Sequence, residues 1–172
     1  MTISSIAILG CGNIGTSIAK GLEKSGMRTN KIILTRRKVK QLVSLKKAGF
    51  QVKNDNGSAV KNSQIILLSV GPSQLMDLLD EITPHLNQNH LLISIVSGVT
   101  ISEIQSKVNS KIDIIRAMPN SAACLGESMT CLSSLNGFHK GLKKAQDLFN
   151  NIGQTLVIDE DQMASATALC AC

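Results

Sequence analysis

Short apolar runs alternate along the chain with segments in which apolar residues recur every three or four positions. Such runs are typical of buried strands, and the longer spacing is typical of helices that pack against a sheet. The predicted strands are residues 5–9, 31–35, 64–69, 90–95, 113–117, 129–132 and 155–158.

The segments between these strands are predicted to be helices. Near residue 13 a helix begins in which Ile14, Ile18 and Leu22 share one face. Another begins at Pro72, since proline suits the first turn of a helix. Its side chains expected to point inward are Leu75, Met76, Leu79 and Ile82. A third helix has an apolar stripe formed by Phe138, Leu142, Ala145, Phe149 and Ile152.

Repeated strand–helix units predict an α/β fold, namely a Rossmann-type, doubly wound, mainly parallel sheet with helices on both faces. We expect residues 1–158 to form this domain. Residues 159–161 are acidic, which favours the start of a helix, and residues 163–172 are small and apolar. We therefore expect residues 159–172 to be the first part of a helix that needs a partner, either a C-terminal domain absent from this stretch or another chain.

Length and composition indicate a globular domain. The chain has 172 residues, of which 43% are hydrophobic. This length is sufficient for a packed core, and this apolar content makes disorder unlikely. Its apolar runs are far shorter than a membrane span, and no secretory signal is visible at its start. We expect a cytoplasmic protein without membrane association.

Cysteines and histidines suggest neither a disulfide framework nor a metal site. The five cysteines form no C-x-x-C pair, which favours reduced, mostly buried thiols; they are Cys11, Cys124, Cys131, Cys170 and Cys172. The histidines are isolated in polar contexts and are expected to be solvated; they are His85, His90 and His139.

The formal charge of +6 favours an anionic ligand. A nucleic-acid surface is disfavoured, because the chain has no Trp or Tyr and only three Phe to stack on bases. The basic residues are also scattered over several predicted helices. A small anionic molecule is the more economical partner.

The turn after the first strand, Gly10-Cys11-Gly12-Asn13-Ile14-Gly15, has the G-x-G-x-x-G spacing. The spacing gains weight because it follows a predicted strand and opens a predicted helix. Gly10 would permit the tight turn, Gly12 would let a pyrophosphate approach the backbone, and Gly15 would let helix and strand pack closely. The pattern predicts a dinucleotide site at the helix N-terminus. The alternative is a tight turn without a ligand.

The end of the second strand indicates which dinucleotide is bound. NAD sites place an acidic residue there, about twenty residues beyond the glycine motif. This chain instead has Thr35, Arg36 and Arg37, followed by Lys38. Two guanidinium groups match a 2′-phosphate in charge and geometry, so the sequence predicts NADP as cofactor. The alternative is that the arginines only cover the start of the next helix.

Three further turns follow predicted strands, at the edge where ligands of open α/β sheets bind. They are Ser69-Val70-Gly71-Pro72, Ile95-Val96-Ser97-Gly98 and Met118-Pro119-Asn120. Small residues and proline are also ordinary turn residues, so each turn is either a ligand contact or turn chemistry alone.

These segments, in this order, resemble the pyrroline-5-carboxylate reductase family. The stretches that carry the resemblance span nearly the whole chain; they are ILGCGNIGTSIAKGL, ILLSVGPSQL, LLISIVSGVTISEI, IIRAMPNSAA and NNIGQTLVIDEDQMASATAL. The family reduces a cyclic imine carboxylate to L-proline with NAD(P)H, in proline biosynthesis.

The resemblance implies roles for particular residues. The glycine loop would hold the pyrophosphate, Arg36 would contact the adenosine 2′ region, and Asn56 falls on an asparagine that contacts the cofactor. The turns after residues 68 and 94 would line the nicotinamide half. The candidate cofactor-binding residues are Leu9, Gly10, Cys11, Gly12, Asn13, Ile14, Gly15, Thr35, Arg36, Arg37, Asn56, Ser69, Val70, Gly71, Pro72, Ile95, Val96 and Ser97. No catalytic residue and no metal ligand is predicted.

The resemblance also implies that part of the enzyme lies elsewhere. In the family a helical C-terminal domain forms the dimer and much of the imine pocket, so the full-length protein is expected to be a homo-oligomer. This stretch is expected to bind NADPH (reduced NADP) without efficient catalysis.

Two departures from the family pattern keep other interpretations open. Gly71 stands where the family usually has lysine, and Cys170-Ala171-Cys172 replaces a Ser-Gly-rich stretch. One alternative, a deazaflavin-linked NADP oxidoreductase, rests on the glycine loop and the basic end of the second strand, which such enzymes share. The other is a non-catalytic module that binds or senses NADP.

Overall fold

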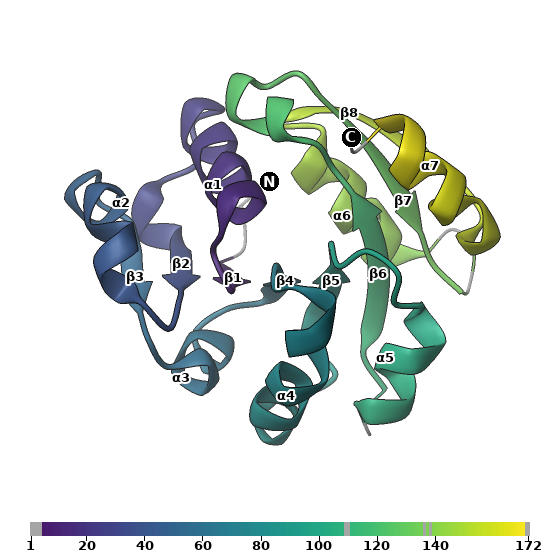
Figure 1. Cartoon of the computed structure of the whole chain (residues 1–172), viewed down its shortest axis with the longest axis horizontal. Helices are drawn as coiled ribbons and strands as arrows, with labels where there is room; N and C mark the ends of the chain where they lie inside the picture. The colour runs from purple at the N-terminus through teal and green to yellow at the C-terminus, as the bar shows by residue number, and fades with distance from the viewer. Residues whose placement is uncertain (1–4, 109–110, 136, 138, 171–172) are drawn as a thin grey trace.

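A single sheet of eight strands organises the described residues (Figure 1). The chain is represented by a computed structural model that describes residues 5–108, 111–135, 137 and 139–170. The expectations for Phe138 and Cys172 concern positions outside that set, as does the side chain of Cys170.

The strand order is β3-β2-β1-β4-β5-β6-β7-β8, and every neighbouring pair is parallel except β6 and β7. The order runs outward from β1 in both directions, which confirms the predicted doubly wound sheet. The strands are β1 (Ile6–Leu9), β2 (Ile32–Thr35), β3 (Gln51–Lys53), β4 (Ile65–Leu68), β5 (Leu91–Ser94), β6 (Asp113–Met118), β7 (Ser128–Ser133) and β8 (Gly153–Val157).

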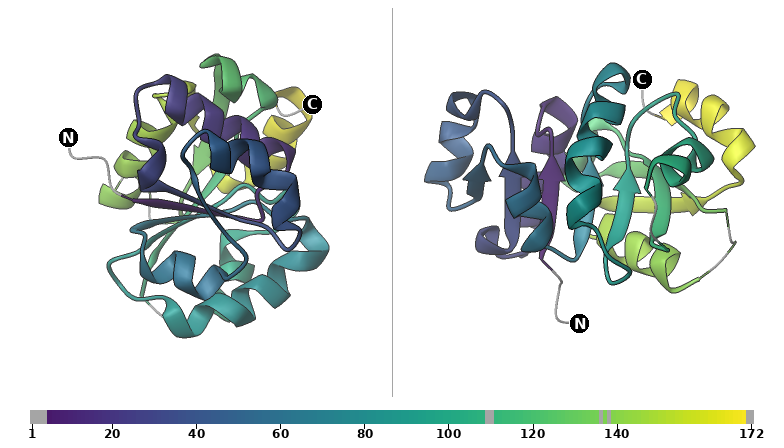
Figure 2. Two further views of the ribbon diagram at one scale, coloured as in Figure 1. Left: turned by 90° about the vertical axis from the view of Figure 1, so that its left-hand side faces the viewer. Right: turned by 90° about the horizontal axis from the view of Figure 1, so that it is seen from below.

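Helices cover both faces of the sheet (Figure 2). They are α1 (Asn13–Lys24), α2 (Val43–Lys47), α3 (Asn56–Lys61), α4 (Pro72–Ile82), α5 (Ile101–Lys107), α6 (Lys140–Phe149) and α7 (Met163–Cys170). Short 3-10 turns are η1 (Thr29–Lys31), η2 (Val39–Leu42), η3 (Thr83–His85), η4 (Ser121–Leu125) and η5 (Glu160–Gln162). No helix among these residues is long and apolar enough to cross a bilayer.

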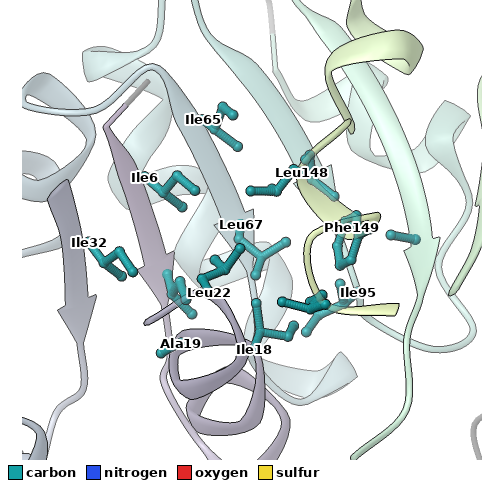
Figure 3. Close-up of a cluster of buried hydrophobic side chains, with 14 of the residues drawn as sticks. Ile6, Ile18, Ala19, Leu22, Ile32, Ile65, Leu67, Ile95, Leu148 and Phe149 are labelled. Carbon is teal, nitrogen blue, oxygen red and sulfur yellow. The ribbon is translucent and has the colours of Figure 1, made fainter. Parts of the chain in front are cut away.

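Two apolar cores lie on opposite faces, and the central strands contribute to both. Ile6 points to the core under α1, α2 and α6 (Figure 3), and Ile8 belongs to the same core. Ala7 and Leu9 point to the core under α3, α4 and α5. Because side chains alternate along a strand, a strand covered on both faces must be apolar at every position. The continuous apolar runs in the sequence therefore mark the buried centre of the sheet.

Apart from 3-10 turns, the described residues include one strand and one helix that the sequence pattern did not predict. Strand β3 is polar and lies at the edge of the sheet, so it has no apolar run. Helix α3 has six residues and begins with Asn56-Gly57, a pair typical of turns. Its N-cap is Asp55, whose carboxylate accepts a hydrogen bond from the Ser58 N–H at 2.8 Å.

Two burial predictions were wrong. Met76 is exposed rather than inward, because the buried face of α4 uses Leu75, Leu78, Leu79 and Ile82. His90 is buried rather than solvated, and its Nδ1 accepts a hydrogen bond from the Asn87 N–H at 3.0 Å. The cysteine prediction holds where it can be seen: Cys11 and Cys131 are buried, Cys124 is half-buried, and no disulfide joins them.

Candidate functional site

The three glycines of the turn between β1 and α1 meet different neighbours. Gly10 has a φ of +79°, which favours glycine, and a Cβ there would overlap the Val70 side chain. A Cβ on Gly15 would lie 2.9 Å from Ser69 Oγ and 3.1 Å from Ile8 Cγ2, so this glycine allows α1 to pack closely.

Gly12 is the N-cap of α1 and faces open space. A Cβ there would have one neighbour within 4 Å, the Gly10 carbonyl oxygen at 3.8 Å, and no side chain caps the helix. The first N–H groups of α1 are therefore accessible to an anion.

Beside this turn lies a cleft of about 660 Å³ at the carboxyl ends of β1, β2 and β4. This is the position at which open α/β sheets bind ligands. The cleft is lined by Gly10, Gly12, Thr35, Arg36, Arg37, Lys38, Gln41, Asn54, Asn56, Ser69, Val70, Gly71, Gln74, Asp77, Leu78 and Glu81.

A chain of hydrogen bonds crosses the cleft from the glycine turn to α4. The Gly10 N–H donates to Thr35 Oγ1 at 3.3 Å, and the Thr35 hydroxyl donates to Asn56 Oδ1 at 2.6 Å. Asn56 Nδ2 then donates to Glu81 Oε2 at 2.9 Å. Thr35 is buried, so its hydroxyl holds Asn56 at the end of β2.

The basic side of the cleft comes from the end of β2. Arg36 is half-buried and its Nη1 donates to the Cys11 carbonyl at 3.2 Å, which ties it to the glycine turn. Arg37 and Lys38 are exposed. Burial raises the pKa of the Cys11 thiol, although the Thr16 hydroxyl and Arg36 oppose this. Cys11 is fully buried and packs in the core under α1.

The cleft brings together about half of the sequence-predicted site residues. Those that line it are Gly10, Gly12, Thr35, Arg36, Arg37, Asn56, Ser69, Val70 and Gly71. Those outside its lining are Leu9, Cys11, Asn13, Ile14, Gly15, Pro72, Ile95, Val96 and Ser97. Leu9 and Cys11 are buried beside the turn, and residues 13–15 begin α1. Ile95 points into the core beside Ile18 and Phe149 (Figure 3), Val96 lies in the opposite core, and Ser97 is exposed.

Sequence reasoning missed the side of the cleft that α4 provides. Gln74, Asp77 and Glu81 follow one another at intervals of three and four residues, on the face away from buried Leu75 and Leu79. This polar stripe is visible in the sequence. Its position opposite the arginines depends on the fold.

The fold and the open glycine turn define a Rossmann-type α/β domain of the class that binds nucleotide cofactors. Residues 5–98 match the family model described as "NADP oxidoreductase coenzyme F420-dependent". The chain belongs to this family.

Several relatives are named pyrroline-5-carboxylate reductase. The chain is 40% identical to pyrroline-5-carboxylate reductase 1 of Dictyostelium discoideum over 98% of its own length and 33% of that protein. It is 38% identical to pyrroline-5-carboxylate reductase 2 of the same organism, over 98% of this chain and 62% of the relative. The chain thus spans less than two thirds of either protein.

Solved structures agree on the fold. A pyrroline-5-carboxylate reductase from Coxiella burnetii superposes with a TM-score of 0.90 at 29% identity, covering 98% of this chain and 64% of that one. A Plasmodium falciparum pyrroline carboxylate reductase with NADP bound gives a TM-score of 0.88 at 26% identity, covering 99% and 63%. The sequence-based resemblance is confirmed.

Proposed function

We propose that the cleft binds NADPH and that the chain is the cofactor-binding half of an enzyme that reduces 1-pyrroline-5-carboxylate to L-proline. The observation that carries the proposal is the open turn at Gly12 beside the two arginines that end β2. The relatives' names and the NADP of the P. falciparum structure support it. In this proposal residues 1–158 hold the cofactor, and residues 159–172 begin a helix toward the part of the longer relatives that the chain does not cover.

The residues present fit a phosphorylated dinucleotide. The N–H groups at the start of α1 suit a pyrophosphate, and a side chain on Gly12 would fill their approach. Arg36 and Arg37 suit a 2′-phosphate. Ser69 lines the cleft, and its buried Oγ lies against Gly15 at the start of α1 without a hydrogen-bond partner among the described residues.

In this proposal the chain orients the cofactor. When bound, the nicotinamide supplies the hydride that reduces a C=N bond. The glycine turn fixes the diphosphate, Arg36 and Arg37 fix the adenosine end, and residues 69–71, which line the cleft, contact the nicotinamide half. Correct placement of the reacting atoms is itself a large part of catalysis, and no acid or base from this part of the chain is required for it.

Titration calorimetry with NADPH and NADH tests the cofactor assignment. We expect NADPH to bind at least about tenfold more tightly, because two guanidinium groups contact a phosphate that NADH lacks. Arg36→Ala combined with Arg37→Ala should weaken NADPH binding and leave NADH binding nearly unchanged. The control Arg28→Ala removes an exposed arginine outside the cleft. Equal affinities of the wild type for both cofactors would contradict the 2′-phosphate role.

The reaction is tested by following NADPH absorbance with 1-pyrroline-5-carboxylate as the substrate. We expect residues 1–172 to turn over slowly, and a form extended to the length of the relatives to turn over efficiently. Rapid turnover by residues 1–172 would contradict the proposed division between cofactor and substrate parts.

A second candidate activity is hydride exchange between NADPH and a deazaflavin coenzyme. The description of the family model that matches residues 5–98 favours it. The stretches at residues 114–123 and 150–169, which carry the reductase resemblance, lie outside that match. Reduction of the deazaflavin by NADPH in the extended protein, without imine reduction, would select this candidate.

A further inference from the structure

The cleft has two walls of opposite charge. Arg36, Arg37 and Lys38 line one wall, and Asp77 and Glu81 of α4 line the other. Within the part of the chain that the structure describes, no ion pair joins the two walls. Both sets of charges are thus available to act on a ligand in the cleft.

Glu81 is the acidic residue that is fixed in place. Its Oε2 accepts the hydrogen bond from Asn56 Nδ2 at 2.9 Å, and Asn56 Oδ1 accepts the Thr35 hydroxyl at 2.6 Å. A carboxylate can only accept hydrogen bonds, so it requires the NH₂ group of Asn56 on its side and the amide oxygen toward Thr35. Asn56 therefore holds a negative charge at the end of β2, although Glu81 itself is exposed.

This arrangement supplies, from a different element, the group that the second strand lacks. In NAD sites an acidic residue at the end of β2 accepts the ribose hydroxyls. Here arginines follow β2, and the Glu81 carboxylate of α4 is linked through Asn56 to Thr35, the last residue of β2. Its charge opposes a 2′-phosphate but not a 2′-hydroxyl.

We propose that Glu81 is a specificity-determining residue that reduces the preference of the cleft for NADPH over NADH. This inference rests on the proposed function, since it concerns how the same cleft discriminates between two dinucleotides. Arg36 and Arg37 attract the 2′-phosphate, and Glu81, held by Asn56, offsets part of that attraction. The cleft thus accepts both cofactors with a smaller NADPH preference than the arginines alone would give.

The test uses Glu81→Gln, which removes the charge and retains an amide oxygen that can accept from Asn56. Its matched control is Asp80→Asn, which removes one negative charge from the neighbouring position of α4. Asp80 lies outside the cleft lining and pairs with Lys107 at 2.8 Å. Dissociation constants for NADPH and NADH are measured by calorimetry for each protein at one ionic strength, because salt screens such effects.

We expect Glu81→Gln to raise the NADPH-to-NADH affinity ratio by about threefold or more, the size expected for one nearby charge in a solvated cleft. NADH affinity should not rise with it, since NADH carries no 2′-phosphate for the Glu81 charge to repel, and Asp80→Asn should leave the ratio unchanged. An unchanged ratio in Glu81→Gln, or an equal rise in both variants, would overturn the inference while the proposed function stands. If the wild type binds neither dinucleotide, both the inference about Glu81 and the proposed function are overturned.

Discussion

Glu160 and Arg116 form an ion pair between β6 and the turn that leads into α7. Glu160 Oε1 lies 3.3 Å from Arg116 Nη1 and also accepts the Ile101 N–H at 2.7 Å. The two side chains are only 18% and 7% exposed, so water compensates little of either charge. One carboxylate thereby connects the start of α7 to the sheet and to the first residue of α5.

Replacing one partner should therefore destabilise the fold. Glu160→Gln keeps an acceptor for Ile101 but removes the carboxylate that pairs with the buried Arg116 charge, which is then left with only the more distant attraction of Glu103. This should cost about 2–3 kcal/mol. Denaturant unfolding measures the loss. The comparison is Asp80→Asn, which breaks the exposed pair between Lys107 and Asp80 and should cost less than about 1 kcal/mol. Equal losses in the two variants would contradict a buried role for Glu160.

Glycine substitutions in the first turn should separate binding from folding. Gly12→Val should remove NADPH binding while thermal unfolding stays close to wild type, because a side chain there enters open space. Gly15→Val should lower stability by about 1–3 kcal/mol, since its Cβ meets Ser69 and Ile8. Calorimetry measures the NADPH affinity of both variants, and thermal unfolding measures their stability. If Gly12→Val still binds NADPH, the turn is not the phosphate site.

Gly71 offers a gain-of-binding test. It lines the cleft at the N-cap of α4 with φ −67°, and a Cβ there would meet only Gln74 Oε1, at 3.8 Å. Gly71→Lys should therefore fold with a change within about 1 kcal/mol, including the unfavourable helix dipole. We expect it to tighten NADPH binding several-fold, about 1 kcal/mol, because a cation is added beside the ligand.

Gly71→Gln is the control, since glutamine has a long polar side chain without charge. Calorimetry on the two variants measures whether the gain in NADPH affinity depends on the charge of the lysine. If glutamine tightens binding as much as lysine does, the gain does not come from charge.

The place of the glycine turn and of the arginines in the cleft could be predicted because both follow strands directly, at the edge of the sheet where the cleft lies. The buried strands could be predicted because burial on both faces requires continuous apolar runs. Helix α3 could not be predicted, because a six-residue segment is too short to show a helical repeat of apolar residues and its first residues resemble a turn. The link from Asn56 to Glu81 joins residues 25 positions apart, so only the packing of α3 near α4 reveals it.

His90 should make stability depend on pH. Its buried ring accepts the Asn87 N–H and bonds to the backbone of Ser63 and Val60. Burial lowers the pKa of His90 below its usual value despite the backbone bonds, so the folded state favours the neutral ring. The unfolded chain then binds the proton more readily, and the stability is fully present above about pH 6.5 and lost as the pH falls toward the folded-state pKa.

We expect the free energy of unfolding, measured in urea, to decrease between about pH 7 and pH 5 by an amount that His90→Gln removes. The variant should be less stable than wild type at pH 7, because the glutamine cannot reproduce both the Asn87 bond and the backbone bonds, yet its stability should change less on acidification. Carboxylates contribute the same background slope to both proteins, so the difference between the two curves isolates His90. Parallel curves across this range would show that protonation of His90 is not coupled to unfolding.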